Sequence, residues 1–206
     1  VSKKLVKHFK TVENLIKASF DELIAVDETN LTPGPMIFND NLNVDFGIDI
    51  HTGGKQRNNY PQIRYTPDSE EGKQLATIFN APYQFGSNLI AKSFRKAAHN
   101  HNIPIIVYEG GESLRFDKFA IRKGKEGILN ILEHFEMIPK RKLKKTEPTI
   151  EIAKRKWIRA KIAGMLNLRI KNGEAVTKGQ TLGYITDTYG ESTLRIPAPY
   201  DGYIIA

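Results

Sequence analysis

One histidine of the chain follows a strand-like apolar segment, where it could bind a metal ion. In Val44–His51, apolar residues alternate with other residues at the period of a β-strand, so Asp49 and His51 should point to the same side. Gly53 and Gly54 then release the backbone into a turn. An imidazole at such a place can bind a metal or hydrogen-bond to a neighbour, and the spacing favours neither interpretation.

A glutamate stands in a comparable position later in the chain. Ile103–Tyr108 is almost wholly apolar, and Glu109 and two glycines follow it. Burial there would raise the pKa of the carboxyl toward the range that suits proton transfer. Beside a metal that acidifies its bound water, Glu109 could support amide hydrolysis. The alternative is a structural ion pair with Arg115 or Arg122.

A polar stretch, Lys55–Arg64, comes directly after His51. It carries Arg57 and Arg64, and guanidinium groups bind carboxylates with two parallel hydrogen bonds. The stretch therefore predicts either a loop that binds the acidic end of a substrate or an ordinary exposed loop. Both interpretations stay open at this point.

The elements that must position these residues follow from hydrophobic periodicity. Amphipathic helices are predicted at about 12–24, 69–80, 89–101 and 120–135. Strands separated by helices tend to lie parallel, so the strands before His51 and Glu109 should end at the same sheet edge. We therefore expect an α/β fold with a mixed, mainly parallel sheet flanked by helices, in which these two side chains meet.

The remainder of the chain has a different character. Short apolar segments punctuated by glycine replace helical periodicity, which predicts a small all-β barrel or sandwich. We therefore expect an α/β domain at 1–138, a basic linker at 139–149 and a C-terminal β domain at 150–206. The β domain should border the active-site entrance or an oligomer contact.

Composition limits the classes of function. The 206 residues include no cysteine, which excludes thiolate metal sites and cysteine nucleophiles. The net charge is +8, but five positive residues lie together in 140–145, as in a solvated linker. We therefore expect no nucleic-acid partner. A basic nucleic-acid binder is an alternative hypothesis. No apolar run is long enough for a membrane span or a secretory signal, so we expect a cytoplasmic protein without a membrane partner.

Taken in order, the motifs resemble the succinylglutamate desuccinylase/aspartoacylase family of the zinc carboxypeptidase-like clan. They are His-Thr-Gly-Gly at 51–54, the arginine-flanked stretch 57–64, Val-Tyr-Glu-Gly-Gly at 107–111 and the glycine-rich tail. The resemblance implies a zinc-dependent amidohydrolase that removes an acyl group from an N-acylated amino acid, its small-molecule partner. It assigns His51 as a zinc ligand, Glu109 as the catalytic carboxylate, and Arg57 and Arg64 as candidates for substrate binding.

The resemblance has one departure. The family's earlier zinc-binding motif, of the type His-x-x-Glu, is absent: His8 has Glu13 five positions later. A catalytic zinc site normally has three protein ligands, and His51 is one. We expect segments missing from this sequence to supply the others, and the alternative is a catalytically inactive relative that binds a ligand on the same scaffold. The sequence also leaves a homo-oligomer open.

Overall fold

The computed structural model describes residues 44–54, 57–142 and 147–206; the predicted helix at 12–24 lies outside these ranges. The described part contains three helices and ten strands. The helices are α4 (Glu70–Phe79), α5 (Phe94–Asn100) and α6 (Lys118–His134). The first five strands are β1 (Gly47–Gly53), β2 (Asn59–Tyr65), β3 (Tyr83–Gly86), β4 (Ile105–Glu112) and β5 (Ile150–Glu151). The other five are β6 (Met165–Leu168), β7 (Ala175–Val176), β8 (Thr181–Thr186), β9 (Thr193–Pro197) and β10 (Gly202–Tyr203).

The three predicted helices in the described region are present, and their ends have local causes. At the start of α4, the Ser69 side chain accepts a hydrogen bond from the Gly72 amide, and Asn80 ends the helix in a left-handed conformation. Helix α5 is shorter than the predicted 89–101. It begins only after its cap Ser93, because Lys92 has a φ of 62° and interrupts the turn before it.

Strands β1–β5 form one sheet in the order β1-β4-β2-β3-β5. Three of the four neighbouring pairs are parallel, and β2 runs antiparallel to β4. The expected mixed, mainly parallel sheet is therefore confirmed. The loop predicted for Lys55–Arg64 is wrong from Asn59 onward. Ile63 in this stretch and Tyr65 directly after it are buried, and β2 is a central strand.

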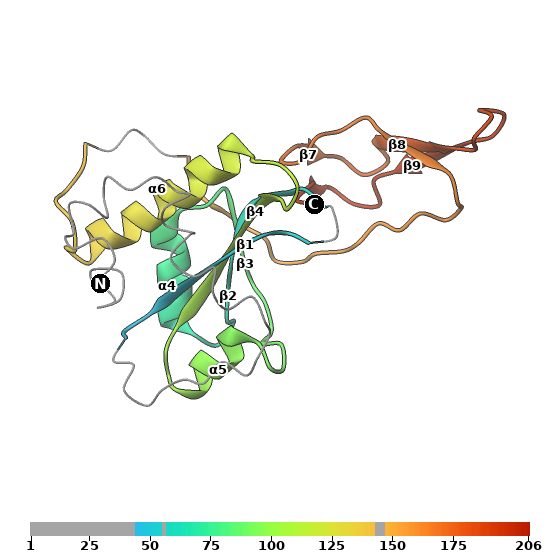
Figure 1. Ribbon diagram of the computed structural model, residues 1–206. Coiled ribbons are helices and arrows are strands. Elements are labelled where there is room, and N and C mark those ends of the chain that lie inside the picture. The colour runs from blue at the N-terminus through green and yellow to red at the C-terminus, as the bar shows by residue number, and fades with distance from the viewer. Residues whose placement is uncertain (1–43, 55–56, 143–146) are drawn as a thin grey trace.

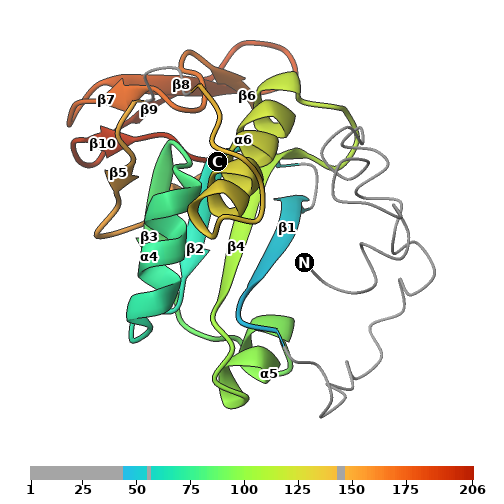
Figure 2. The ribbon, with the colours of Figure 1, turned by 90° about the vertical axis from the view of Figure 1, so that its left-hand side faces the viewer.

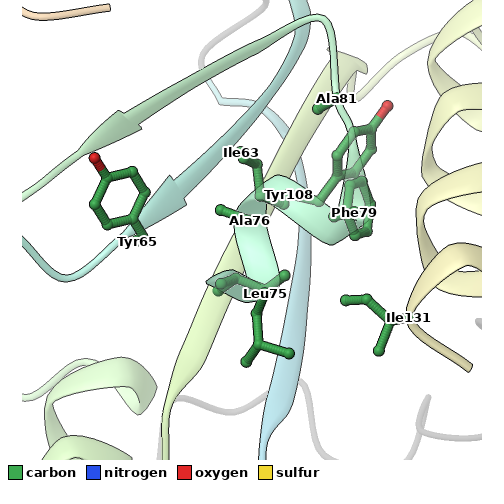
Figure 3. Close-up of a cluster of buried hydrophobic side chains, with 9 residues drawn as sticks. Ile63, Tyr65, Leu75, Ala76, Phe79, Ala81, Tyr108 and Ile131 are labelled. Atoms are coloured by element: carbon green, nitrogen blue, oxygen red, sulfur yellow. The ribbon is translucent and has the colours of Figure 1, made fainter. Parts of the chain in front are cut away.

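Helices α4 and α6 cover one face of the sheet (Figure 2). Between them and the sheet lies the main core, and Figure 3 shows how its side chains converge. Its buried members are Ile63, Tyr65, Leu75, Ala76, Phe79, Ala81, Ile106, Tyr108 and Ile131. The alternate residues of the same strands point to the opposite face, where the candidate site lies.

The C-terminal strands form two small antiparallel sheets, β6-β8-β9 and β10-β7, around a separate core of Val176, Leu182 and Ala198. This arrangement agrees with the expected small all-β unit. The unit packs beside the end of the large sheet where β2 begins (Figure 1). There the Tyr60 amide donates to the Ile205 carbonyl at 3.0 Å, and the Tyr83 hydroxyl donates to the Gly173 carbonyl at 2.9 Å.

The sheet continues beyond the expected basic linker. Strand β5 pairs with β3, so residues 150 and 151 belong to the large sheet, although the sequence suggests a C-terminal β domain from 150 onward. Within the described ranges, none of the helices combines the length and apolar character needed to cross a membrane.

Candidate active site

His51 and Glu109 are paired residues in neighbouring strands. Strands β1 and β4 run parallel, and the Cα atom of His51 is registered with that of Glu109. Both side chains therefore leave the sheet on the same face, from strands about 5 Å apart. The expected meeting of these residues is observed. The strands do not end at these residues, however, because pairing continues to Gly53 and Glu112 after a register shift.

The imidazole of His51 is oriented by a carboxylate on its own strand. Its Nε2 lies 2.9 Å from Oδ2 of Asp49, which confirms that the two side chains share one side of β1. This hydrogen bond raises the pKa of His51 above its usual 6.5 and outweighs the lowering effect of burial. A carboxylate of this kind holds an imidazole in one orientation, as the outer partners of metal-binding histidines do.

Glu109 has two partners on β2. Its Oε2 accepts hydrogen bonds from Nη2 of Arg64 and, at 3.3 Å, from Nε2 of Gln62, which is its registered neighbour. The alternative ion pairs expected from the sequence are wrong: Arg115 pairs with Glu112, and Arg122 lies 4.0 Å from a glutamate on its own helix. A guanidinium beside a largely buried carboxylate favours its ionised form, which is the form that accepts a proton.

Arg64 lies in a strongly basic environment. Burial, and then the charges of Arg155, Arg95 and Arg57, lower the pKa of Arg64 to about 10. The side chain therefore stays positive at neutral pH. Its Nε is buried and has no hydrogen-bond partner among the described residues, so the guanidinium has one donor that these residues do not use.

Arg57 is not joined to these groups by a hydrogen bond. Its Nε donates to the Gly54 carbonyl at 2.9 Å, and its guanidinium lies 5.2 Å from the ring centre of Trp157. The structure thus brings His51, Glu109 and Arg64 together, whereas Arg57 occupies the turn after β1. Its charge reaches the site only at longer range.

Sequence reasoning missed several residues that surround the site. Gln62 was recognisable, because it precedes Arg64 by two residues and strand periodicity places both on one face. Phe85, Arg95 and Arg155 come from other elements, and no local pattern indicates that they meet. Their position depends on the strand order, which the sequence does not specify.

The described residues do not by themselves form a zinc site. Within residues 44–54, 57–142 and 147–206, no three His, Cys, Asp or Glu side chains are grouped so that they could hold a metal ion. His51 offers one ring nitrogen beyond the one that contacts Asp49. A catalytic zinc site needs further protein ligands, which the described part of the chain does not contribute.

The fold is similar to that of several solved structures. A succinylglutamate desuccinylase/aspartoacylase from Rhodobacter sphaeroides superposes with a TM-score of 0.67 at 22% identity, over 79% of this chain and 52% of that one. The apo ectoine utilization protein EutE (DoeB) from Ruegeria pomeroyi gives the same TM-score at 21% identity, over 79% and 54%. An aspartoacylase family protein from Mesorhizobium loti gives 0.61 at 17% identity, over 78% and 56%.

The family follows from the sequence match. Residues 35–135 match the succinylglutamate desuccinylase/aspartoacylase catalytic domain, so this part of the chain belongs to that family, as the motifs predict. The chain spans about half the length of the solved structures it resembles. No protein with a curated description matches its sequence significantly.

Proposed function

We propose that this chain is part of a zinc-dependent amidohydrolase that removes an acyl group from an N-acylated amino acid. The observation that carries the proposal is the registered pair of His51 and Glu109, with Arg64 bonded to the carboxylate. The family match to a deacylase catalytic domain over the same residues supports it. Within this proposal, His51 contributes one zinc ligand, and the other ligands lie outside the described residues.

The chemistry assigned to Glu109 is proton transfer. Its ionised carboxylate accepts a proton from the attacking water and later donates one to the nitrogen of the leaving amine. Zinc, when bound, supplies Lewis-acid activation. The neighbours of Glu109 have defined tasks in this scheme. Gln62 and Arg64 fix its Oε2, and the positive charge of Arg64 keeps it ionised before the reaction.

The proposed substrate contact is electrostatic. An N-acylated amino acid carries at least one carboxylate, and Arg64 and Arg57 provide positive charge on the side of the sheet that carries Glu109 and in the turn after β1. Arg64 has a buried donor without a partner, which makes it the stronger candidate of the two. Arg57 is exposed and would act at the rim.

Metal analysis of the whole natural protein, combined with hydrolysis assays, tests the proposal. We expect stoichiometric zinc that is lost in His51→Ala but kept in Glu109→Gln, while both variants lose hydrolysis of N-acyl amino acids. His99→Ala, which changes an imidazole at the end of α5, is the matched control and should change neither property. Zinc binding unaffected by His51→Ala contradicts the assignment. A catalytically inactive ligand-binding relative would instead show no zinc and ligand binding that survives Glu109→Gln.

A further inference from the structure

Arg155 reaches the sheet from the segment that follows β5. The Ile152 amide donates to the Gln84 carbonyl at 2.8 Å, which holds this segment against β3. Three residues further, the guanidinium carbon of Arg155 lies 3.9 Å from the ring centre of Phe85. The side chain also donates to the Gly86 carbonyl at 3.3 Å. Arg155 is thus placed by both backbone pairing and stacking, although the residue itself is exposed.

Phe85 connects this arginine to the candidate active site. It is 1% exposed, and its Cα atom is registered with that of Arg64 on β2. The guanidinium carbon of Arg64 lies 5.6 Å from the same ring centre. Two guanidinium groups therefore border one buried aromatic ring, and one of them holds the carboxylate of Glu109.

A third guanidinium adds to this positive charge. Arg95, at the start of α5, is 6% exposed, and its Nη2 donates to the Ser87 carbonyl at 3.0 Å and the Asn88 carbonyl at 2.8 Å. Its Nη1 is buried and has no partner among the described residues. The charge of Arg155 disfavours the charged form of Arg95 and that of Arg64. Positive groups that act on one another in this way favour binding of an anion nearby.

The carboxylates nearby do not neutralise Arg155. Glu109 pairs with Arg64, and Asp49 pairs with His51. In the part of the chain that the structure describes, Arg155 has no carboxylate partner and makes one hydrogen bond. A guanidinium has five N–H donors, so most of those on Arg155 are available to a ligand.

We propose that Arg155 is a specificity-determining residue that binds a carboxylate of the substrate, next to the Glu109–Arg64 pair. The inference rests on the proposed function, because the substrate is taken to be an N-acylated amino acid whose scissile amide lies at Glu109. It assigns part of substrate selection to the segment that links β5 to β6. The ligand chemistry is a carboxylate that presents two oxygens to the guanidinium fork.

Calorimetric titration with succinate and its half-amide, succinamate, tests the binding step directly. The two probes differ in one carboxylate. We expect Arg155→Met, which retains an unbranched side chain over Phe85, to weaken succinate binding about tenfold or more and to abolish the preference for succinate over succinamate. Arg159→Met changes another exposed arginine four residues further along the same segment and should leave both affinities unchanged. Unchanged succinate affinity in Arg155→Met overturns the proposal, and so does a wild-type protein that does not prefer succinate.

Steady-state kinetics separates this inference from the proposed function. With an N-acyl amino acid that bears a second carboxylate, Arg155→Met should raise KM more than it lowers kcat, and the effect should disappear when that carboxylate is an amide. If neither the wild type nor any variant hydrolyses the substrates but Arg155→Met no longer binds succinate, the result supports the carboxylate site and contradicts the proposed hydrolase function. If hydrolysis is confirmed and Arg155→Met changes neither KM nor succinate binding, the inference alone fails.

Discussion

His51 and Glu109 lie opposite each other in a parallel strand pair, each on the face of the sheet opposite the main core. The two residues are almost sixty positions apart in the sequence, but they lie on adjacent strands. The two side chains differ in their partners: Asp49 holds the imidazole, and Arg64 holds the carboxylate. The site therefore consists of two adjacent acid–base pairs with complementary charges.

Glu109→Gln should abolish most of the hydrolytic activity. The amide cannot accept the proton of the attacking water, and loss of a general base typically costs about 10²–10⁴-fold in rate. Gln62 and Arg64 can still donate to the amide oxygen, so the fold should persist. Initial rates with N-acyl amino acids measure the effect. Glu126→Gln, on the exposed side of α6, is the control. Activity within about tenfold of wild type in Glu109→Gln would assign the base to another residue.

Arg64→Met should destabilise the protein, because it leaves the Glu109 carboxylate without its cation. The Glu109 side chain is 15% exposed, and removal of one partner of a buried ion pair costs about 3–5 kcal/mol. Urea unfolding of wild type, Arg64→Met, Glu109→Gln and the double variant forms a cycle. We expect the double variant to be more stable than Arg64→Met alone. Additive losses would mean that the ion pair contributes nothing.

Local patterns in the sequence were sufficient to predict β1, β4 and the three helices in the described part. The alternation before His51 and the apolar run before Glu109 each report on one segment, and the parallel arrangement follows from the helices between strands. The proximity of the two residues could therefore be predicted. The position of β2 could not, because its polar residues resemble a loop, and its antiparallel insertion beside β4 depends on pairing between distant segments.

The partners of Glu109 were missed for the same reason. Arg115 and Arg122 are nearer in sequence than Arg64, but Arg115 turns to Glu112 and Arg122 lies on α6. Only the strand order brings Arg64 and Gln62 beside the carboxylate. The contacts of Phe85 and Arg155 depend on a further strand, because they form only when β3 pairs with β2. Sequence periodicity assigns residues to faces but does not specify which faces adjoin.

Asp49→Asn should lower the pKa of His51. The Asp49 carboxylate stabilises the protonated ring by its negative charge, and the asparagine amide has no such charge. NMR titration of the ring in chelator-treated protein should give a pKa above 6.5 in wild type and a lower value in the variant. Since the folded-state pKa is raised, this pair stabilises the protein below pH 6.5, and the contribution disappears as the pH rises through the folded-state value.

The same linkage predicts the pH dependence of stability. Asp49→Asn should cost more stability near pH 5.5 than near pH 8.5, since a larger fraction of the ring is protonated in the first condition. Asp68→Asn, at an exposed position before α4, should show no such difference. A cost that is equal at both pH values would show that the ion pair does not operate in solution.

Gly173→Ala should weaken the attachment of the C-terminal unit to the large sheet. Gly173 has a φ of 90°, and an added Cβ would lie 2.3 Å from the Tyr60 ring, so both the backbone and the packing oppose the change. Its carbonyl also accepts the hydrogen bond from Tyr83. We expect a loss of about 1–3 kcal/mol in urea unfolding. Gly179→Ala shares the positive φ, at 86°, but meets no atom within 4 Å. It should therefore cost only the backbone strain, about 1 kcal/mol.

Because Tyr60 and Gln62 share β2, hydrogen exchange should accelerate at the start of this strand in Gly173→Ala but not in Gly179→Ala. Equal exchange in the two variants would show that the C-terminal unit does not support the strand that holds Gln62 and Arg64 against Glu109.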